Sequence, residues 1–229
     1  GDWQGSGDTR QATQVTMVQG ASIEANATQQ GDGGKVVLWS DVHNPSSLTQ
    51  VEGRIEAKGA GSASKGGNGG QVETSGHTLQ VGELALSTQA TGSGNSGQWL
   101  LDPSDVTISS GTNAGQAYAA STFTPTSGAA TSVVNTATLQ GVLDASSTTI
   151  TVTTTNTGSS GAGTGNITMA SNLAWTSTSK LILLATGGLT GSGNIVTGAA
   201  GSNLTINQAG TSSYSGAISG SGSLTKLGA

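Results

Sequence analysis

Two stretches of the sequence, GDGGKVVLWS at residues 31–40 and GGNGGQVETS at residues 66–75, each place a glycine-rich segment directly before a short alternating strand. A looser copy, GNSGQWLLD, begins at Gly94. Alternation of apolar and polar residues with many β-branched side chains predicts half-buried strands. The pattern of a glycine segment followed by a strand occurs three times, which predicts a repeating β architecture.

The strands that precede the glycine segments have their own repeat. ASIEA surrounds Ile23 and GRIEA surrounds Ile55, 32 residues further on, whereas Gly70 and Gly97 are 27 residues apart. Strands of similar length at unequal spacing indicate insertions at the corners, which a solenoid tolerates. The sequence therefore predicts an all-β fold, a parallel β-solenoid.

Stacking the repeats predicts columns of side chains that run from coil to coil. Two inward columns are expected, Val36–Val72–Trp99 and Leu38–Thr74–Leu101, with one outward column, Lys35–Gln71–Gln98. Glu24 and Glu56 share a further outward column, where like charges about 4.8 Å apart repel mildly. A solvated face explains these two carboxylates more simply than a cation site does.

The repeated glycines are interpreted as structural. Gly33, Gly34, Gly69, Gly70 and Gly97 are expected at the corners of the coils, where positive φ and close packing between turns both favour glycine.

Composition limits the function classes. The chain of 229 residues has 38 glycines, whereas average usage would give about 16. With 8% charged residues and a net charge of −5, it lacks the basic surface that nucleic acid requires. The longest apolar run, LILLA at 181–185, is strand-sized, so no membrane insertion is expected. The absence of cysteine fits a protein exported through the periplasm.

The sequence changes character after WLLDPSD. We divide it into residues 1–105, glycine-cornered coils with long corner insertions, and residues 106–229, a Ser/Thr/Gly-rich continuation of the same solenoid. Residues 111–147 are expected to form an irregular insertion. Within it, Leu139, Val142 and Leu143 at helical spacing behind Asn135 or Thr136 predict one short flanking helix near 136–144.

These motifs carry a family resemblance. GDGGKVVLWSD, GGNGGQVETSG and WLLDPSDVTI, in that order, resemble the large exoproteins of the filamentous haemagglutinin type, and SYSGAISGSGSLTKLG at the end resembles the autotransporter-associated repeat. The resemblance implies a right-handed parallel β-helix passenger of two-partner (type V) secretion in Gram-negative bacteria. It also implies an outer-membrane secretion pore as a partner and an extracellular or cell-surface location.

Nucleotide and calcium motifs are incomplete. A phosphate-binding loop needs Ser or Thr after its lysine and a following helix, but Lys35 precedes a β-branched strand. The calcium β-roll repeats aspartate between its coils, but Asn68 takes the place that Asp32 occupies in the preceding copy. No metal site and no cofactor are expected.

Catalysis needs clustered acids and bases. The pairs available are Asp41 with His43, Glu52 with Glu56, and Asp102 with Asp105. A solvated corner explains the first, and Asp102, which precedes Pro103, is expected to end its strand with a hydrogen bond to the backbone. His43 and His77 are interpreted as two surface residues. No enzyme activity is expected.

We therefore expect a structural and adhesive rod segment that attaches to glycans or proteins on host or bacterial surfaces, or to other copies. Trp39, Glu24 and Glu56 are the candidate surface contacts, because an aromatic ring can stack on a sugar. Two alternatives remain: a spacer or self-assembling filament subunit whose copies associate end to end, and, less favoured, a carbohydrate-active β-helix enzyme.

Overall fold

The computed structural model describes residues 1–110, 118–119, 122–123, 132–145, 147–154 and 163–229. Its strands form two large sheets and two small ones. The nine-stranded sheet contains β1 (Gln14–Met17), β2 (Ser22–Glu24), β4 (Leu48–Glu56), β6 (Thr78–Ser87), β8 (Val106–Ser109), β11 (Val133–Asn135), β13 (Ile167–Met169), β16 (Leu189–Gly191) and β19 (Ser213–Tyr214). The seven-stranded sheet contains β3 (Lys35–Trp39), β5 (Gln71–Ser75), β7 (Gln98–Asp102), β12 (Thr149–Thr153), β15 (Lys180–Ala185), β18 (Asn203–Gln208) and β21 (Ser223–Gly228).

The remaining elements are short. β14 (Leu173–Ala174), β17 (Ile195–Thr197) and β20 (Ile218–Gly220) form a three-stranded sheet, and β9 (Tyr118–Ala119) pairs with β10 (Thr122–Phe123). The helices described are the 3-10 turn η1 (Trp3–Gly5) and α1 (Thr136–Ala145).

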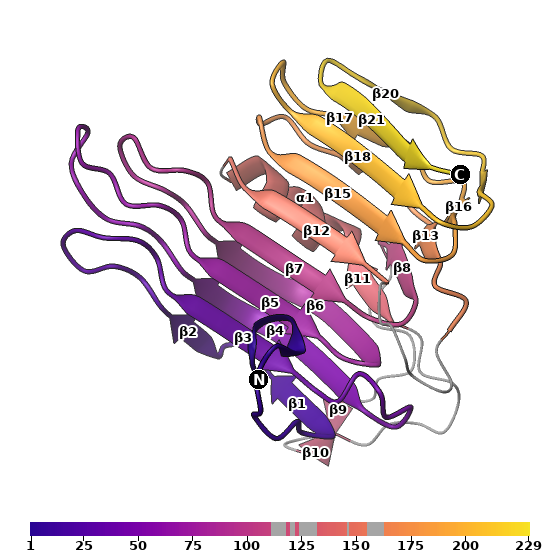
Figure 1. Ribbon diagram of the computed structural model, residues 1–229, viewed down its shortest axis with the longest axis horizontal. Coiled ribbons are helices and arrows are strands. Elements are labelled where there is room, and N and C mark those ends of the chain that lie inside the picture. The colour runs from indigo at the N-terminus through magenta and orange to yellow at the C-terminus, as the bar shows by residue number, and fades with distance from the viewer. Residues whose placement is uncertain (111–117, 120–121, 124–131, 146, 155–162) are drawn as a thin grey trace.

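Parallel pairing dominates the fold. Every named strand pair except β9–β10 is parallel, and the chain passes repeatedly from one sheet to the next. Figure 1 shows the strands of the seven-stranded sheet stacked from the N-terminal coils to the C-terminal ones, with long loops projecting from the early coils. This arrangement is consistent with the β-solenoid that the sequence predicts.

The predicted columns are confirmed by the register. Val36 pairs with Val72 and Val72 with Trp99, and the column continues through Ile150 and Leu181. The Leu38–Thr74–Leu101 and Lys35–Gln71–Gln98 columns are also present, as is the Glu24–Glu56 pair. The inward side chains stack into one buried cluster that runs through the coils.

Close approach, and not positive φ, explains the five corner glycines. None of them has its φ in the left-handed region. A Cβ at Gly70 would overlap the carbonyl oxygen of Gly34, and one at Gly97 would overlap that of Gly70. Gly33 and Gly69 meet the carbonyl oxygens of neighbouring coils in the same way, and Gly34 lies against Ala25. The coils stack closely here because these positions carry no side chain.

Asparagine and aspartate side chains connect successive coils at the corners. Asn68 N donates to Asp32 Oδ1 at 2.8 Å, and Asn95 N donates to Asn68 Oδ1 at 2.7 Å. A second ladder links Asn194 N to Asn172 Oδ1 at 2.8 Å and Ala217 N to Asn194 Oδ1 at 2.9 Å. These bonds satisfy backbone donors just before the chain enters β5, β7, β17 and β20.

Helix α1 matches its prediction closely. Asn135 Oδ1 accepts hydrogen bonds from Ala137 N at 2.8 Å and Thr138 N at 3.3 Å, so Asn135 is the N-cap. Leu139, Val142 and Leu143 are buried in the core. Much of the predicted irregular insertion 111–147 lies outside the described residues.

The order of strands departs from a simple coil in one place. In the nine-stranded sheet, β11 lies between β6 and β8, although β8 precedes it in the chain. The chain therefore leaves a space above β6, forms β8, and returns to fill that space with β11. The large sheets nonetheless run without a break from residues before 105 to residues after it.

Candidate functional site

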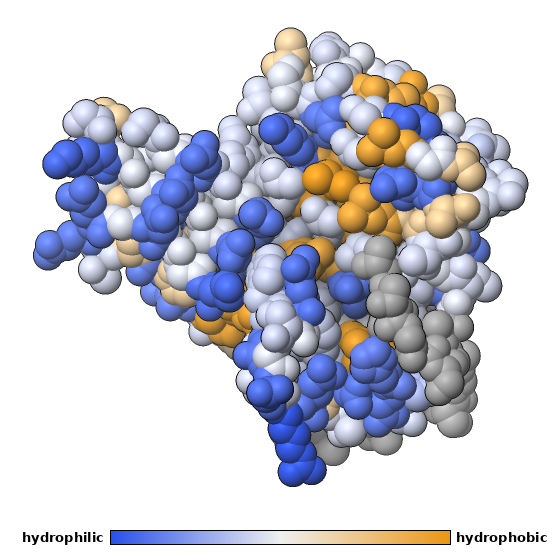
Figure 2. All heavy atoms as spheres, viewed as in Figure 1, coloured by the Kyte–Doolittle hydropathy of each residue, from blue (hydrophilic) through white to orange (hydrophobic). Residues whose placement is uncertain are grey.

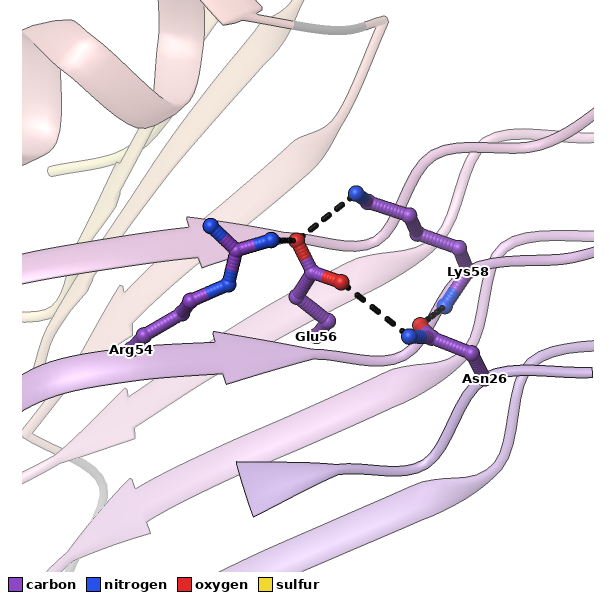
Figure 3. A network of polar contacts seen from close by, with 4 residues as sticks. All are labelled: Asn26, Arg54, Glu56 and Lys58. Carbon is purple, nitrogen blue, oxygen red and sulfur yellow. Dashed lines mark hydrogen bonds and ion pairs between the residues drawn. The ribbon is translucent and has the colours of Figure 1, made fainter. Parts of the chain in front are cut away.

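Glu56 is the centre of a polar network on the outer side of β4 (Figure 3). Its Oε1 forms ion pairs with Arg54 and, at 2.7 Å, with Lys58 Nζ. Its Oε2 accepts from Asn26 Nδ2 at 3.1 Å, and Asn26 Oδ1 accepts from Lys58 N at 2.8 Å. The strand sets this arrangement, because Arg54, Glu56 and Lys58 alternate along one side of the chain.

The network stabilises the charged form of Glu56. The hydrogen bond from Lys58 is the main cause that lowers the pKa of this carboxyl below its usual value, with further contributions from Asn26 and Arg54. The Arg54 and Lys58 side chains keep 54% and 35% of their surface exposed, so solvent screens the ion pairs. The network orders the surface more than it stabilises the fold.

A groove runs between this network and α1. It has a volume of about 810 Å³ and is lined by Arg54, Glu56 and Glu83, by the end of β6, and by one side of the helix. Gln19 Nε2 donates to Glu83 Oε2 at 3.2 Å at its rim. Ala137, Gly141 and Ala145 form the helical wall, so small side chains leave the groove wide.

The outer side of the seven-stranded sheet holds two neighbouring carboxyl groups, the buried Glu73 on β5 and the half-buried Asp102 on β7. Burial raises the pKa of Asp102 to about 7, and the charge of Glu73 adds to the shift. Burial also raises the pKa of Glu73, against hydrogen bonds from Gln4 N and Ser75 Oγ. Loss of solvation and the nearby charge of Glu73 therefore both favour the protonated form of Asp102.

The N-terminal segment covers part of this outer face. Gln4 N donates to Glu73 Oε2 at 2.8 Å, and Gly5 lies directly on the ring of Trp39. A recess of about 360 Å³ remains beside it, lined by Trp39, His43 and Asp102 among others. Asp102 Oδ1 and Trp39 Nε1 are buried and have no hydrogen-bond partner within the described part of the chain. Sequence reasoning missed this pairing because Glu73 and Asp102 meet only through the strand register.

The three predicted contact residues lie in different surroundings. Glu24 is exposed on β2, beside Glu56 in the register. Trp39 is 6% exposed beneath the N-terminal segment, and Glu56 is 8% exposed beneath its ion-pair partners. Of the three, Glu24 alone offers an open side chain, and the contact role stays a prediction.

The carboxylate pairs expected from the sequence have other partners. Asp105 does not join Asp102 but accepts from Thr164 N at 3.0 Å and Asn166 N at 2.9 Å. We expected Asp102 to accept a hydrogen bond from the backbone, but its Oδ1 has no partner among the residues that the structure describes. Asp41 Oδ1 accepts from His43 N at 2.9 Å in a local turn. Glu52 lies against Gly82 and is half-buried.

The two histidines and the tryptophans Trp99 and Trp175 have separate surroundings. His43 is exposed, whereas His77 Nδ1 lies 3.2 Å from the carbonyl oxygen of Val42. Trp99 and Trp175 are buried and donate to Thr74 Oγ1 and to the carbonyl oxygen of Ser179. Within the described ranges, no group of three or more His, Cys, Asp or Glu residues is placed to hold a metal ion.

The surface chemistry divides along the stack. Figure 2 shows hydrophilic residues gathered over the N-terminal coils and more hydrophobic residues over the C-terminal strands. Leu224 and Leu227, on β21, are 52% and 50% exposed. No helix in the part of the chain that the structure describes is long and apolar enough to cross a membrane.

Comparison with known proteins gives no further assignment. Neither the models of protein families nor the curated proteins include a match to this sequence. The resemblance to the filamentous haemagglutinin type stays a prediction.

Proposed function

We propose that this chain is a rod segment of a right-handed parallel β-helix exoprotein of the filamentous haemagglutinin type, which attaches to surfaces through its extended outer faces. In this proposal the rod is secreted through an outer-membrane pore and acts outside the cell or on its surface. Its partners are glycans or proteins on host or bacterial surfaces.

The observation that carries the proposal is the unbroken seven-stranded ladder from β3 to β21. Its outward positions in the later coils are mostly small and polar, among them Thr149 and Thr151 on β12 and Asn203 and Thr205 on β18. Hydroxyl and amide groups repeated at the strand spacing offer many weak hydrogen bonds to a long partner. A surface of this kind binds by area and repetition, without the acid–base cluster that catalysis requires.

Binding of the folded chain to a broad glycan array and to host and bacterial cells tests the proposal. We expect saturable binding that a defined sugar or surface protein competes. Glu24→Gln removes the exposed carboxylate among the predicted contacts, and Glu52→Gln on the next strand is its matched control. Absence of binding at micromolar concentration, in a chain with native circular dichroism, would contradict an adhesive role and favour the spacer.

A further inference from the structure

A polar recess lies beside the ends where β7, β12, β15 and β18 begin, and its volume is about 370 Å³. The long loop before β7 and the shorter corners before the other three strands line it with small and polar residues, which are Asn95, Ser96, Ser147, Thr178 and Gly201. All five are exposed. Figure 2 shows the surface hollowed between the projecting loops of the early coils and the C-terminal coils. The recess is therefore open to a ligand.

Lys180, the first residue of β15, gives the recess its charge. Its side chain is exposed, and no other described residue that lines the recess is ionisable. The ion pairs found in the described part of the chain both belong to Glu56, so Lys180 has no acidic partner there. Asp144, the one acidic side chain between residues 106 and 229, accepts from Thr176 N at 2.6 Å and Thr176 Oγ1 at 2.9 Å. The recess therefore presents an unpaired positive charge.

The other polar side chains of the recess are uncharged. Ser147 Oγ and Thr178 Oγ1 lie 3.0 Å apart and form a hydrogen bond with each other. The hydroxyl groups of Ser96 and Thr149 have no hydrogen-bond partner among the residues that the structure describes. Thr149 is also the residue that pairs with Lys180 in the register, so its hydroxyl lies one strand away from the lysine. Because a hydroxyl both donates and accepts, these groups suit a ligand that carries hydroxyl groups of its own.

These groups indicate the chemistry of the ligand. The volume lies at the lower end of the range of small-ligand sites, about 300–1,000 Å³. One lysine balances one negative charge, whereas a nucleic acid or a heavily sulfated chain carries many charges and would be repelled by a protein with a net charge of −5. A sugar with a single carboxylate supplies both the charge for Lys180 and the hydroxyl groups for the rest of the recess.

We propose that this recess binds a carboxylate-bearing sugar residue. The carboxylate lies on Lys180 Nζ, and the sugar hydroxyls exchange hydrogen bonds with Ser96 and Thr149. Because Lys180 is exposed, solvent screens the ion pair and a single sugar binds weakly, so firm attachment to a surface requires many rods bound at once. The inference rests on the proposed function, and it names an acidic glycan as the partner of the rod.

Nuclear magnetic resonance of the nitrogen-15-labelled chain, titrated separately with sialyllactose and with trigalacturonic acid, tests the proposal. We expect saturable shifts of the Ser96 and Lys180 amide signals with at least one of these acids, and the acid that binds distinguishes a terminal sialic acid from a uronic acid chain. The methyl ester of the same sugar keeps the hydroxyl groups but loses the charge, so it should bind about tenfold more weakly.

Two pairs of variants locate the site. Lys180→Gln should weaken binding by about tenfold or more, whereas Lys226→Gln, on β21 outside the recess, should leave it within about twofold. Thr149→Glu places a carboxylate beside Lys180 in the register, so it should neutralise the lysine and weaken binding by about tenfold. Thr149→Gln is the matched uncharged control and should stay within about threefold of the wild type.

The outcomes separate this inference from the proposed function. Absence of a saturable shift with either acid up to about 10 mM, equal binding of the acid and its ester, or undiminished binding by Lys180→Gln would overturn the recess as a sugar site. Glycan-array binding that survives Lys180→Gln would also overturn it, while leaving the adhesive role to the outer faces. Shifts at the recess without binding to any array or cell would support the sugar site and contradict the adhesive role.

Discussion

The first three coils and the last coils of the stack share the same sheets but use different chemistry. Residues 1–105 hold the ion-pair network of Glu56 and the neighbouring carboxyls of Glu73 and Asp102. From Val106 to Ala229 the ionisable side chains are Asp144, Lys180 and Lys226, apart from two tyrosines. There, hydroxyl and amide ladders such as Thr168–Thr190 connect the coils.

This difference separates what the ladder requires from what each region adds to it. Both regions need an inward apolar column and small residues where coils meet. The charged groups of the first region are additions on the outer faces, and they should account for most of the dependence of stability on salt and on pH between acid and neutral values. The predictions below test that separation, beginning with the largest expected effect.

Truncation of the shared inward column should destabilise the whole stack. Trp99 is fully buried between Val72 and Ile150, so Trp99→Ala should lower the free energy of unfolding by about 3–5 kcal/mol. Leu181→Ala, in the same column of the second region, should cost about 2–4 kcal/mol. Urea unfolding measures both. Trp3→Ala is the control, because Trp3 lies outside the core cluster. If Trp3→Ala lowers the free energy of unfolding as much as Trp99→Ala does, the account is contradicted.

The neighbouring carboxyl groups of Glu73 and Asp102 should make the first region less stable at high pH. The folded-state pKa of Asp102, about 7, lies above its ordinary value of 3.8, so the folded chain binds this proton more tightly. Its stabilisation is complete below pH 4 and is lost as the pH rises through 7. Between pH 5 and pH 8 the free energy of unfolding should fall by about 2–3 kcal/mol.

Asp102→Asn should remove most of this pH dependence, as followed by urea unfolding at the two pH values. Asp144→Asn is the matched control, because Asp144 accepts from Thr176 N and Oγ1 in the second region. The control should keep the wild-type pH dependence. If the stability of Asp102→Asn still depends on pH as the wild type does, a group other than Asp102 causes that dependence.

Two glycine-to-alanine substitutions should change the free energy of unfolding in opposite directions. Gly97→Ala forces a Cβ against the carbonyl oxygen of Gly70 and should cost about 1–3 kcal/mol. Gly141→Ala adds a methyl group in open space on α1 and should stabilise by up to about 1 kcal/mol. Thermal unfolding of the two variants side by side measures the difference. Similar effects would mean that close coil stacking is not what the corner glycines provide.

The smallest effect concerns the Glu56 network. Glu56→Gln should cost about 1 kcal/mol or less at neutral pH, with the cost shrinking in high salt. Because the folded-state pKa of Glu56 lies below its usual value, this contribution is lost as the pH falls below about 4.5. Asn194→Ala, in the uncharged ladder of the second region, should cost about as much but without salt dependence. Unfolding at two salt concentrations distinguishes them.

The sequence predicts those parts of the structure that repeat or that are local. The Val36–Val72–Trp99 column follows from aligned repeats, and α1 with its Asn135 cap follows from a cap residue and helical spacing. The same reasoning misses arrangements that depend on distant segments. No local pattern shows that the N-terminal segment covers Trp39, or that β11 lies beneath β8.

The candidate sites illustrate the same limit. The sequence suggests Asp105 as the partner of Asp102, whereas the coil register pairs Asp102 with Ser75 and brings it near Glu73, two residues before Ser75. The groove was not predicted either, because it arises where a helix replaces a strand in the stack. Alignment of GGQVETS with SGQWLLD could have placed Glu73 one coil from Leu100 and near Asp102.

The central claim is that both regions form one ladder, and a distance along that ladder tests it most directly. Lys35 and Lys180 are exposed and occupy one column, separated by Gln71, Gln98 and Thr149. Spin labels on Lys35→Cys and Lys180→Cys, in a chain without native cysteine, can be measured by double electron–electron resonance. Four strand spacings predict a narrow distribution near about 19 Å, whereas a broad distribution beyond about 30 Å would contradict one continuous ladder.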